Sequence, residues 1–326
     1  MKILITTVPF GEQSKLPTEL LDSLDVEYLI NPLNKKLTEN ELAEMIPDYD
    51  IIIAGTEPIT DYVLSKAKKL KMISRVGIGL DSVDLISAKK RGIQVSYTPD
   101  APAPAVAELT IGLFISLLRS VQLSNIEMHN GEWKRYFGKR IANCTIGIIG
   151  LGRIGSRVLN RLTVFGTPRL LVNDLSINTE LDRKFKLEWV DKETIYQESD
   201  IISLHVPLTI ATKNMVTKKE LEMMKSSASI VNTSRGGVIN EKDLYNAMSS
   251  GHLAGAAVDV FDNEPYDGNL KNIDRCLLTS HMGSMSIDCR NRMEIEAVEE
   301  ALRFVRGETL KSAVPNGEYD SQSAGL

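Results

Sequence analysis

The sequence predicts an α/β protein with two doubly wound domains, each built on a parallel sheet. Short β-branched and aliphatic runs alternate with longer amphipathic runs through most of the 326 residues. Continuous apolar strands separated by helices are typical of a parallel sheet that is covered on both faces. The alternation occurs twice, with a proline-rich stretch at 98–104 between the two series. The chain is also longer than one ordinary hydrophobic core requires, so we expect two domains.

In the first series, apolar runs predict strands and amphipathic runs predict the helices that connect them. The segment 98–121 opens with three prolines and then runs apolar at helical spacing, which predicts a hinge followed by a long buried helix. The predicted strands are residues 2–8, 26–30, 50–55, 71–77 and 93–98, and the predicted helices are residues 17–24, 38–46, 61–70 and 83–92.

The second series ends in a helix, 289–307, that has no strand after it. We expect this helix to return to the first domain, which makes that domain discontinuous. The expected boundaries are 1–100 with 285–326 for one domain and 101–284 for the other. The polar residues 316–326 predict a disordered tail. The predicted strands of this series are residues 145–150, 169–174, 200–206, 229–234 and 254–260.

Composition and charge exclude several classes of function. Apolar residues make up 43% of the chain and charged residues 25%, as in soluble globular proteins. With a net charge of −5 and no basic stripe, nucleic acid and anionic membranes are not expected as partners. No apolar run approaches the roughly 18 residues of a membrane span. Three scattered cysteines without a CxxC pair predict reduced thiols in a cytoplasmic protein, not a disulfide frame or a zinc site.

A glycine-rich turn predicts a dinucleotide site. Gly150, Gly152 and Gly155 follow an apolar strand and open a helix in the G-x-G-x-x-G spacing, which suits a tight turn, a close approach to pyrophosphate and tight helix packing. Asp174 ends the next strand, 19 residues beyond Gly155, where an acid accepts hydrogen bonds from ribose hydroxyls. The alternative for Asp174 is a turn or helix-capping residue. No basic residue follows it before Arg183, so NAD is favoured over NADP.

Polar side chains follow three later strands of the same series. Arg235 follows one strand, Asp259 and Glu264 follow the next, and His281 follows the last. In open α/β sheets ligands bind beyond the carboxyl ends of the strands, so we expect these residues to face one crevice. Taken singly, Arg235 also fits a surface turn, Glu264 a solvated acid and His281 a surface loop.

Seven motifs, taken together and in order, resemble the D-isomer-specific 2-hydroxyacid dehydrogenases, which include phosphoglycerate, glycerate, D-lactate and formate dehydrogenases. The resemblance covers about residues 50–310 and implies a Rossmann NAD-binding domain inserted into a flavodoxin-like substrate domain. The motifs are RVGIGLDSVDL, AVAELTIGL, GIIGLGRIG, LHVPLT, NTSRGGVINEKDL, AGAAVDVFDNEP and TSHMGS.

The same resemblance implies roles for individual residues. It makes Arg235 the substrate-binding arginine, His281 the acid/base and Glu264 its carboxylate partner, and it places Asp259 on the nicotinamide side. The remaining positions implied for the cofactor are Gly150, Gly152, Arg153, Ile154, Gly155, Asp174, Val206, Pro207, Thr212, Thr233 and Gly283, and those implied for the substrate are Arg75, Val76, Gly77 and Ile78.

These residue types suit the implied reaction. When a hydride leaves C2 of a hydroxy acid, the hydroxyl proton needs an acceptor, and an imidazole can take and return it near neutral pH. A carboxylate beside the ring, as Glu264 is to His281, fixes its tautomer and favours the imidazolium. A guanidinium can grip the substrate carboxylate, and the N–H groups of the loop 76–79 would complete the clamp from the other domain.

Departures from the family pattern limit the substrate. Phosphoglycerate enzymes carry an arginine where this chain has Ala54, and Glu57 is close by, so a distal phosphate would lose one counter-charge and meet a repulsive one. Arg75 matches a family arginine that faces the distal group, and Arg135 matches one that reaches across a dimer. Both arginines fit surface positions as well.

The leading hypothesis is an NAD-dependent D-2-hydroxyacid dehydrogenase (EC 1.1.1.-) that acts as a 2-oxoacid reductase on a small-molecule substrate. The alternative is an NAD(H)-sensing, corepressor-like binding protein on the same scaffold, and a third reading is a formate or phosphite dehydrogenase. The segment 123–140 interrupts the alternation and in the family embraces a second subunit, so a homodimer is expected.

Overall fold

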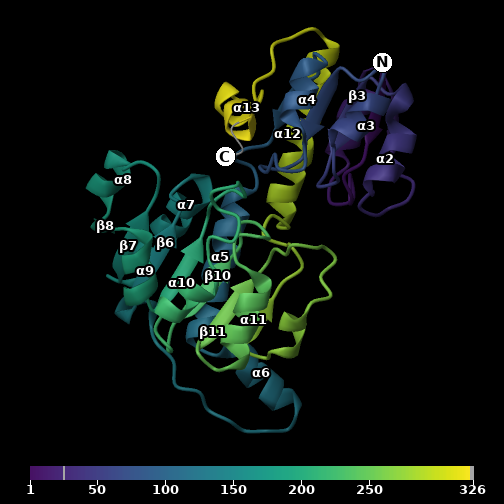
Figure 1. The fold of residues 1–326 in the computed structure, drawn as a ribbon. Helices are drawn as coiled ribbons and strands as arrows, with labels where there is room; N and C mark the ends of the chain where they lie inside the picture. Colours follow the sequence, from purple (N-terminus) through teal and green to yellow (C-terminus); the bar gives the residue numbers. More distant parts are fainter. Residues whose placement is uncertain (25, 324–326) are drawn as a thin grey trace. The chain divides into compact units, whose positions relative to one another are not determined.

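The computed structural model describes residues 1–24 and 26–323, which form two compact units (Figure 1). Unit 1 comprises Met1–Pro102 together with Met285–Leu326, and unit 2 comprises Ala103–Ser284. Unit 1 contains a five-stranded sheet and unit 2 a seven-stranded sheet, and every strand pair in both is parallel. The predicted α/β class with two parallel sheets is confirmed.

The strands of unit 1 lie in the order β2-β1-β3-β4-β5, which is the flavodoxin-like order. Its strands are β1 (Lys2–Ile5), β2 (Glu27–Ile30), β3 (Ile51–Ala54), β4 (Met72–Arg75) and β5 (Gln94–Tyr97). Its helices are α1 (Leu16–Asp22), α2 (Glu39–Met45), α3 (Asp61–Lys66), α4 (Leu85–Lys90), α12 (Ile287–Val305) and α13 (Asn316–Ser323), with the short 3-10 helix η1 (Ile46–Asp48).

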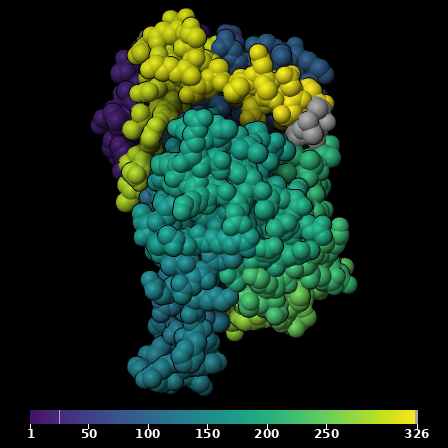
Figure 2. All heavy atoms as spheres, turned by 90° about the vertical axis from the view of Figure 1, so that its left-hand side faces the viewer, coloured from purple at the N-terminus to yellow at the C-terminus, as the bar shows by residue number. Residues whose placement is uncertain are grey.

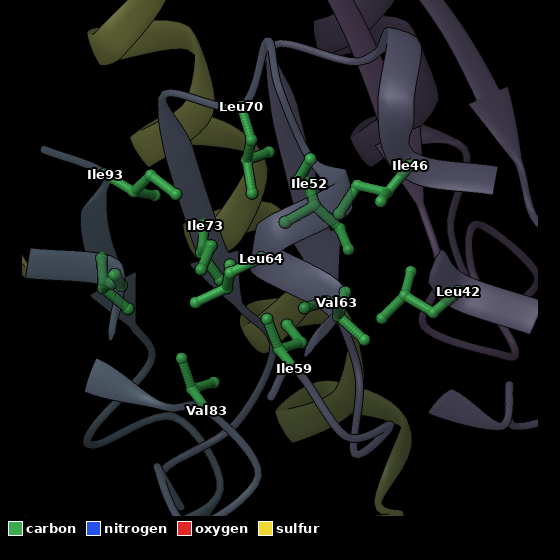
Figure 3. Close-up of a cluster of buried hydrophobic side chains, with 14 of the residues drawn as sticks. Leu42, Ile46, Ile52, Ile59, Val63, Leu64, Leu70, Ile73, Val83 and Ile93 are labelled. Carbon is green, nitrogen blue, oxygen red and sulfur yellow. The ribbon is translucent and has the colours of Figure 1, made fainter. Parts of the chain in front are cut away.

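Both faces of the unit 1 sheet are covered, which explains why β3 is apolar at every position. On one face, Ile52 and Ile73 of the sheet pack against Leu42 of α2 and Val63 of α3 (Figure 3). On the other face, α1 and α12 close a second cluster with the remaining strand side chains. Thr38 begins α2 with a capping box, so the backbone groups at that helix start are satisfied.

The end of the chain differs from the sequence prediction. Residues 316–323 were expected to be disordered, but they form α13, which packs on α4. Gln322 explains the difference, because its side chain accepts from Leu85 N–H at 2.7 Å and donates to the Val83 carbonyl at 2.9 Å. Tyr319 packs on the core of unit 1 with Lys89 over its ring. These contacts are remote in sequence, and a polar composition does not reveal them.

Unit 2 has the strand order β12-β11-β10-β9-β6-β7-β8, which is the dinucleotide-binding order extended by one strand. The order reverses between β6 and β9, so the ligand crevice of such a sheet lies beyond their carboxyl ends. The strands are β6 (Thr145–Ile149), β7 (Arg169–Asn173), β8 (Leu187–Trp189), β9 (Ile201–Leu204), β10 (Ser229–Asn232), β11 (Gly255–Val258) and β12 (Cys276–Leu278).

The helices of unit 2 cover both faces of its sheet and bury two further apolar clusters. They are α5 (Ala103–Leu118), α6 (Val121–His129), α7 (Arg153–Leu162), α8 (Thr179–Lys184), α9 (Lys192–Glu198), α10 (Lys218–Met223) and α11 (Glu241–Ser249), with the 3-10 helices η2 (Ile141–Asn143), η3 (Thr163–Phe165) and η4 (Asn269–Asn272).

One segment of unit 2, here called the arm (residues 121–140), stands clear of the rest of that unit at the bottom of both views (Figures 1 and 2). It consists of α6 and an irregular stretch, and it carries the exposed aromatic side chains Trp133 and Phe137. Among the described residues no single helix is long and apolar enough to cross a membrane, and only the bent pair α5 and α6 passes on length and composition together.

Candidate active site

The turn after β6 contains three glycines, and two of them have no room for a side chain. Gly150 has a φ of +94°, and a Cβ there would lie 2.5 Å from the carbonyl oxygen of His205. A Cβ on Gly155 would lie 2.0 Å from the carbonyl oxygen of Gly150. Gly152, which caps α7, has nothing within 4 Å of such a position. The open space at Gly152 and the N-terminus of α7 fit a pyrophosphate.

Asp174 follows β7 and bonds to the same turn. Its carboxylate accepts from the N–H of Leu151 at 2.5 Å and from the N–H of Leu175 at 2.6 Å. It is not a helix cap, because α8 begins at Thr179 and Asn178 accepts the cap hydrogen bonds there. Each carboxylate oxygen has a second lone pair, so Asp174 retains acceptors for the hydroxyls of a ribose.

The loop after β9 lies against the glycine turn. His205 has an enclosed ring whose Nε2 is 2.9 Å from Ser203 Oγ, and burial lowers its pKa to about 3. This ring is therefore neutral and unsuited to proton transfer near pH 7. Further along, Thr212 Oγ1 donates to the Pro207 carbonyl at 2.6 Å and accepts from the N–H of Thr209 at 2.8 Å, which holds the loop in a compact turn.

The turn after β10 carries Arg235. Asn232, at the end of the strand, accepts from the N–H and hydroxyl of Ser234 at 3.0 and 2.7 Å and donates to the Arg235 carbonyl at 2.8 Å. Arg235 is half-buried, and its Nη1 donates to the Ser234 carbonyl at 2.7 Å. A Cβ on Gly236 would lie 2.1 Å from backbone atoms of Phe261, so this turn packs directly on the segment that leads to Glu264. Beside it, Thr233 Oγ1 is 2.9 Å from a buried hydroxyl of α5.

Glu264 and His281 form a hydrogen-bonded pair. His281 Nδ1 is 2.8 Å from Glu264 Oε2 and 3.0 Å from Oε1, and Glu264 Oε1 also accepts from the N–H of Phe261 at 3.1 Å. The two side chains are 36% and 23% exposed for His281 and Glu264, so they remain reachable from solvent. His281 itself has a φ of +50°, a left-handed conformation that is uncommon for a residue with a side chain. The surface-loop alternative for His281 does not explain this pairing.

Asp259 follows β11 and is fully buried. Its carboxylate accepts from the hydroxyl of Thr279 and from the N–H groups of Met282 and Gly283. A Cβ on Gly283 would lie 3.0 Å from Asp259 Oδ2, so the glycine allows the loop to come this close. The structure thus gives Asp259 a second set of partners, in addition to the nicotinamide side that the sequence implies.

The residues expected to bind substrate through the first domain lie in unit 1, at the end of β4 (Arg75) and directly after it. Gly77 donates its N–H to Thr98 Oγ1 at 2.7 Å, and its φ of +141° requires a glycine. The buried Arg75 folds back over this loop, because a Cβ on Gly77 would lie 2.2 Å from Arg75 Nη1. Val76 is buried, whereas Ile78 is half-exposed. Arg75 is therefore not one of the surface charges that the sequence left as an alternative.

Three residues that organise the site were not selected from the sequence. Asn232 holds the Arg235 turn, Thr279 bonds Asp259, and Gly236 lets two loops touch. A signal was present for Gly236, since two successive glycines after an arginine indicate a crowded backbone. Asn232 and Thr279 gave no signal, because polar residues at strand ends are common.

Comparison with known proteins adds a family to this geometry. Residues 111–283 match the family described as D-isomer specific 2-hydroxyacid dehydrogenase, NAD binding domain. The chain belongs to this family. As a member it is an oxidoreductase of 2-hydroxy acids and 2-oxoacids that uses a nicotinamide dinucleotide, and the predictions of family, enzyme class and dinucleotide binding are confirmed.

Two relatives and two solved structures illustrate the similarity. The chain is 35% identical to the hydroxypyruvate reductase of Thermotoga maritima over 86% of this chain and 96% of that protein. It is 34% identical to the glyoxylate reductase of Thermococcus litoralis over 82% of this chain and 84% of that protein. D-lactate dehydrogenase from Aquifex aeolicus, complexed with NAD and lactic acid, superposes with a TM-score of 0.82. It is 27% identical to this chain, and the match covers 94% of this chain and 96% of that one. An acyclic imino acid reductase in complex with NADPH and D-arginine superposes with a TM-score of 0.84. It is 25% identical, and the match covers 97% of this chain and 100% of that one.

Proposed function

We propose that the chain is an NADH-dependent reductase of small 2-oxoacids, with His281 and Glu264 as the acid/base pair and Arg235 as the substrate-binding cation. The observation that carries the proposal is the 2.8 Å hydrogen bond from Glu264 to His281 Nδ1, on a ring that stays partly exposed. This bond leaves Nε2, on the other side of the imidazole, to exchange a proton with a bound substrate.

The proposed reaction divides its tasks among residues of this chain. A dinucleotide held by the glycine turn would supply the hydride that C2 of the 2-oxoacid accepts. His281 donates the proton to the developing C2 alkoxide from Nε2, and the carboxylate of Glu264 stabilises the imidazolium beforehand. Arg235 binds the substrate carboxylate and polarises the reacting carbonyl, since a guanidinium offers two parallel donors. In unit 1, the proposed substrate-binding residues are Arg75, Val76, Gly77 and Ile78.

The proposed cofactor positions are those around the glycine turn and the neighbouring loops. Asp174 supports NAD over NADP, because a carboxylate that already bonds the turn would repel a 2′-phosphate. The proposed cofactor contacts are Gly150, Gly152, Arg153, Ile154, Gly155, Asp174, Val206, Pro207, Thr212, Thr233, Asp259 and Gly283.

The proposed substrates are glyoxylate and hydroxypyruvate, the acids named in two of the relatives. Residues after β3 support an uncharged distal group. Ala54 ends the strand where phosphoglycerate enzymes carry arginine, and the carboxylate of Glu57 is 1% exposed, with the N–H of Gly55 bonded to it at 3.0 Å. A carboxyl side chain in this turn, with alanine in place of the arginine, offers no counter-charge to a phosphorylated acid.

A substrate screen tests this function. We expect NADH oxidation with glyoxylate or hydroxypyruvate at a kcat/KM at least about tenfold above that with 3-phosphohydroxypyruvate, which corresponds to about 1.4 kcal/mol of charge discrimination. Absence of turnover with every 2-oxoacid in the screen would remove the proposed activity. Preference for the phosphorylated acid would leave the chemistry intact but reject the assignment of substrate.

Two substitutions test the assigned roles. Arg235→Lys replaces the paired donors by a point charge, so kcat/KM should fall at least about tenfold while NADH affinity stays nearly unchanged. Glu264→Gln keeps the shape of the side chain but removes the charge that favours the imidazolium. The kcat for reduction should then fall, because the side chain at 264 no longer carries a charge that orients the ring and balances its positive charge during proton donation. Wild-type kinetics for both variants would reject the two roles.

We also propose that the arm mediates a homodimer. Trp133 is 77% exposed and Phe137 is fully exposed on one chain, and aromatic side chains in such a position are typical of a subunit interface. Light scattering at micromolar concentration should give twice the 36.1 kDa chain mass. Phe137→Asp should lower this mass toward one chain, and a wild-type monomer would contradict the proposal.

A further inference from the structure

The start of α12 carries a buried ion pair between two residues that lie one helical turn apart. Arg290 Nε donates to Glu294 Oε1 at 2.6 Å, and the two side chains are 9% and 2% exposed. Residues at positions i and i+4 face each other on a helix, so the pair forms within α12 alone. A charge pair so deeply buried is costly unless further hydrogen bonds replace the hydration that both groups lose.

The loop after β1 supplies those hydrogen bonds. Arg290 Nη2 donates to Thr7 Oγ1 at 3.0 Å and to the carbonyl of Pro9. Glu294 Oε2 accepts from the N–H of Gly11 at 2.9 Å. The loop thus presents two acceptors to the cation and one donor to the anion. An apolar pair in α12 could not make these three hydrogen bonds, so the charged pair and the loop depend on each other.

The place of this loop in the sheet connects it with the substrate. The strand order of unit 1 reverses between β1 and β3, and ligands of such a sheet bind beyond the carboxyl ends of the strands at this point. The loop Thr7–Gly11 follows β1 there. Its Phe10 is buried in the same apolar cluster as Met293 of α12 and Val76, which is one of the proposed substrate-binding residues. A shift of the loop therefore changes the packing around Val76.

We propose that Arg290 and Glu294 are positioning residues that hold the loop Thr7–Gly11 in the shape that binds the 2-oxoacid. The inference rests on the proposed function as a 2-oxoacid reductase. Both side chains act through the loop, and neither takes part in the transfer of hydride or proton. Loss of their contacts should weaken substrate binding equally in the ground state and the transition state, which raises KM and leaves kcat nearly unchanged.

Arg290→Lys tests this role, because lysine keeps the positive charge beside Glu294 but lacks the fork of donors that spans helix and loop. We expect KM for glyoxylate or hydroxypyruvate to rise about tenfold, with kcat and the dissociation constant for NADH within about threefold of wild type. Hydrogen–deuterium exchange of the loop Thr7–Gly11 should be faster, because its contacts with α12 are loosened. A wild-type KM, or a loss confined to kcat, would overturn the inference even if exchange is faster.

Arg292→Lys is the matched control on the same helix. Arg292 Nε donates to Glu296 Oε1 at 2.6 Å, so this pair has the same spacing, but its side chains are 58% and 28% exposed. Exposed ion pairs contribute little to structure, so KM and loop exchange should keep their wild-type values. A rise in KM equal to that of Arg290→Lys would show a general effect of α12 and would reject the specific role of the buried pair.

Two variants of Thr7 cover the case in which Arg290→Lys does not fold. Thr7→Val keeps the shape of the side chain but removes the acceptor for Arg290, so KM should rise about threefold. Thr7→Ser keeps the hydroxyl and should restore the wild-type KM. An unchanged KM in Thr7→Val would contradict the proposed role of the loop.

The wild-type protein distinguishes the two levels of the argument. If it reduces no 2-oxoacid, the proposed function fails, and the positioning role fails with it. If it reduces a 2-oxoacid while Arg290→Lys and Thr7→Val keep its KM, the proposed function stands and only the positioning role of the buried pair fails.

Discussion

The glycine turn after β6 and the histidine loop after β12 end strands of the same sheet, yet they are built in opposite ways. The glycine turn requires residues without side chains, because a Cβ on Gly150 or Gly155 would collide with a carbonyl oxygen. The histidine loop depends on hydrogen bonds, because its donors converge on the carboxylate of Asp259. One loop has open space beside its backbone at Gly152, and the other has its backbone fixed on both sides of His281.

The two loops should therefore respond differently to amino-acid substitutions. A residue added to the glycine turn acts through steric overlap and should damage folding and dinucleotide binding together. A residue removed from the histidine loop acts through lost alignment and should damage the rate while the fold survives.

The largest effect is expected from His281→Ala. Loss of a general acid/base costs about 100-fold or more, and here it should reduce both the reduction and the oxidation directions. NADH titration should give a dissociation constant close to wild type, because the change leaves the glycine turn intact. A variant that is fully active in either direction would show that the pair with Glu264 has no chemical task.

Gly155→Ala should damage the glycine turn. The new Cβ would lie 2.0 Å from the Gly150 carbonyl oxygen, and overpacking of this kind costs about 1–3 kcal/mol of folding free energy. Thermal unfolding and NADH titration should both show a loss. Gly152→Ala is the matched control, because its Cβ meets nothing within 4 Å and should weaken NADH binding without lowering stability. Equal melting temperatures for the two variants would contradict the steric account.

Asp174→Ala should change cofactor choice. Removal of the carboxylate relieves repulsion of a 2′-phosphate, which we place at about 1–3 kcal/mol in a partly buried site. The ratio of kcat/KM with NADH to that with NADPH should be well above one in the wild type and should fall in the variant. Equal efficiency with both cofactors in the wild type would refute the preference for NAD.

His205 should make a smaller, pH-dependent contribution to stability. Burial lowers its pKa from the ordinary 6.5 to about 3, so below pH 6.5 the unfolded chain binds a proton that the folded chain does not. The contribution of the neutral His205 ring to the free energy of unfolding is therefore fully present above pH 6.5. As the pH drops below that value, the free energy of unfolding falls by up to about 1.4 kcal/mol per pH unit. His205→Gln keeps a polar atom near Ser203 without this titration, so its unfolding free energy should decline less between pH 6.5 and 5. Parallel declines would contradict this account.

The parts of the molecule that follow a repeating local pattern could be predicted from the sequence. Most strands of both sheets are apolar runs, and the glycine turn has a fixed spacing, so both can be recognised from local sequence. The short edge strand β8, Leu187–Trp189, was missed because three half-buried residues show no periodicity. Helix α13 was missed for a different reason, since its stability depends on Val83 and Leu85, which lie far away in the sequence.

The candidate site divides along the same line. His281, Glu264 and Arg235 could be named as candidates from the sequence because they come at strand ends, and the structure adds the hydrogen bond between His281 and Glu264. The hydrogen bonds that hold these loops could not be predicted from the sequence. Thr279 and Asn232 form them with Asp259, which folding brings close to both.

The discontinuity of unit 1 has a consequence for the order of events during synthesis. Strands β1 to β5 leave the ribosome first, but α12, which covers one face of their sheet, follows only after the 182 residues from Ala103 to Ser284. At about 5–20 residues per second, translation of that insert takes roughly 10 to 40 s. During this interval the apolar side chains of Ile3, Ile5 and Ile51 lack the helix that buries them. Unit 2 can complete its fold within the same interval, so the nascent chain acquires its dinucleotide-binding unit while unit 1 still lacks α12 and α13.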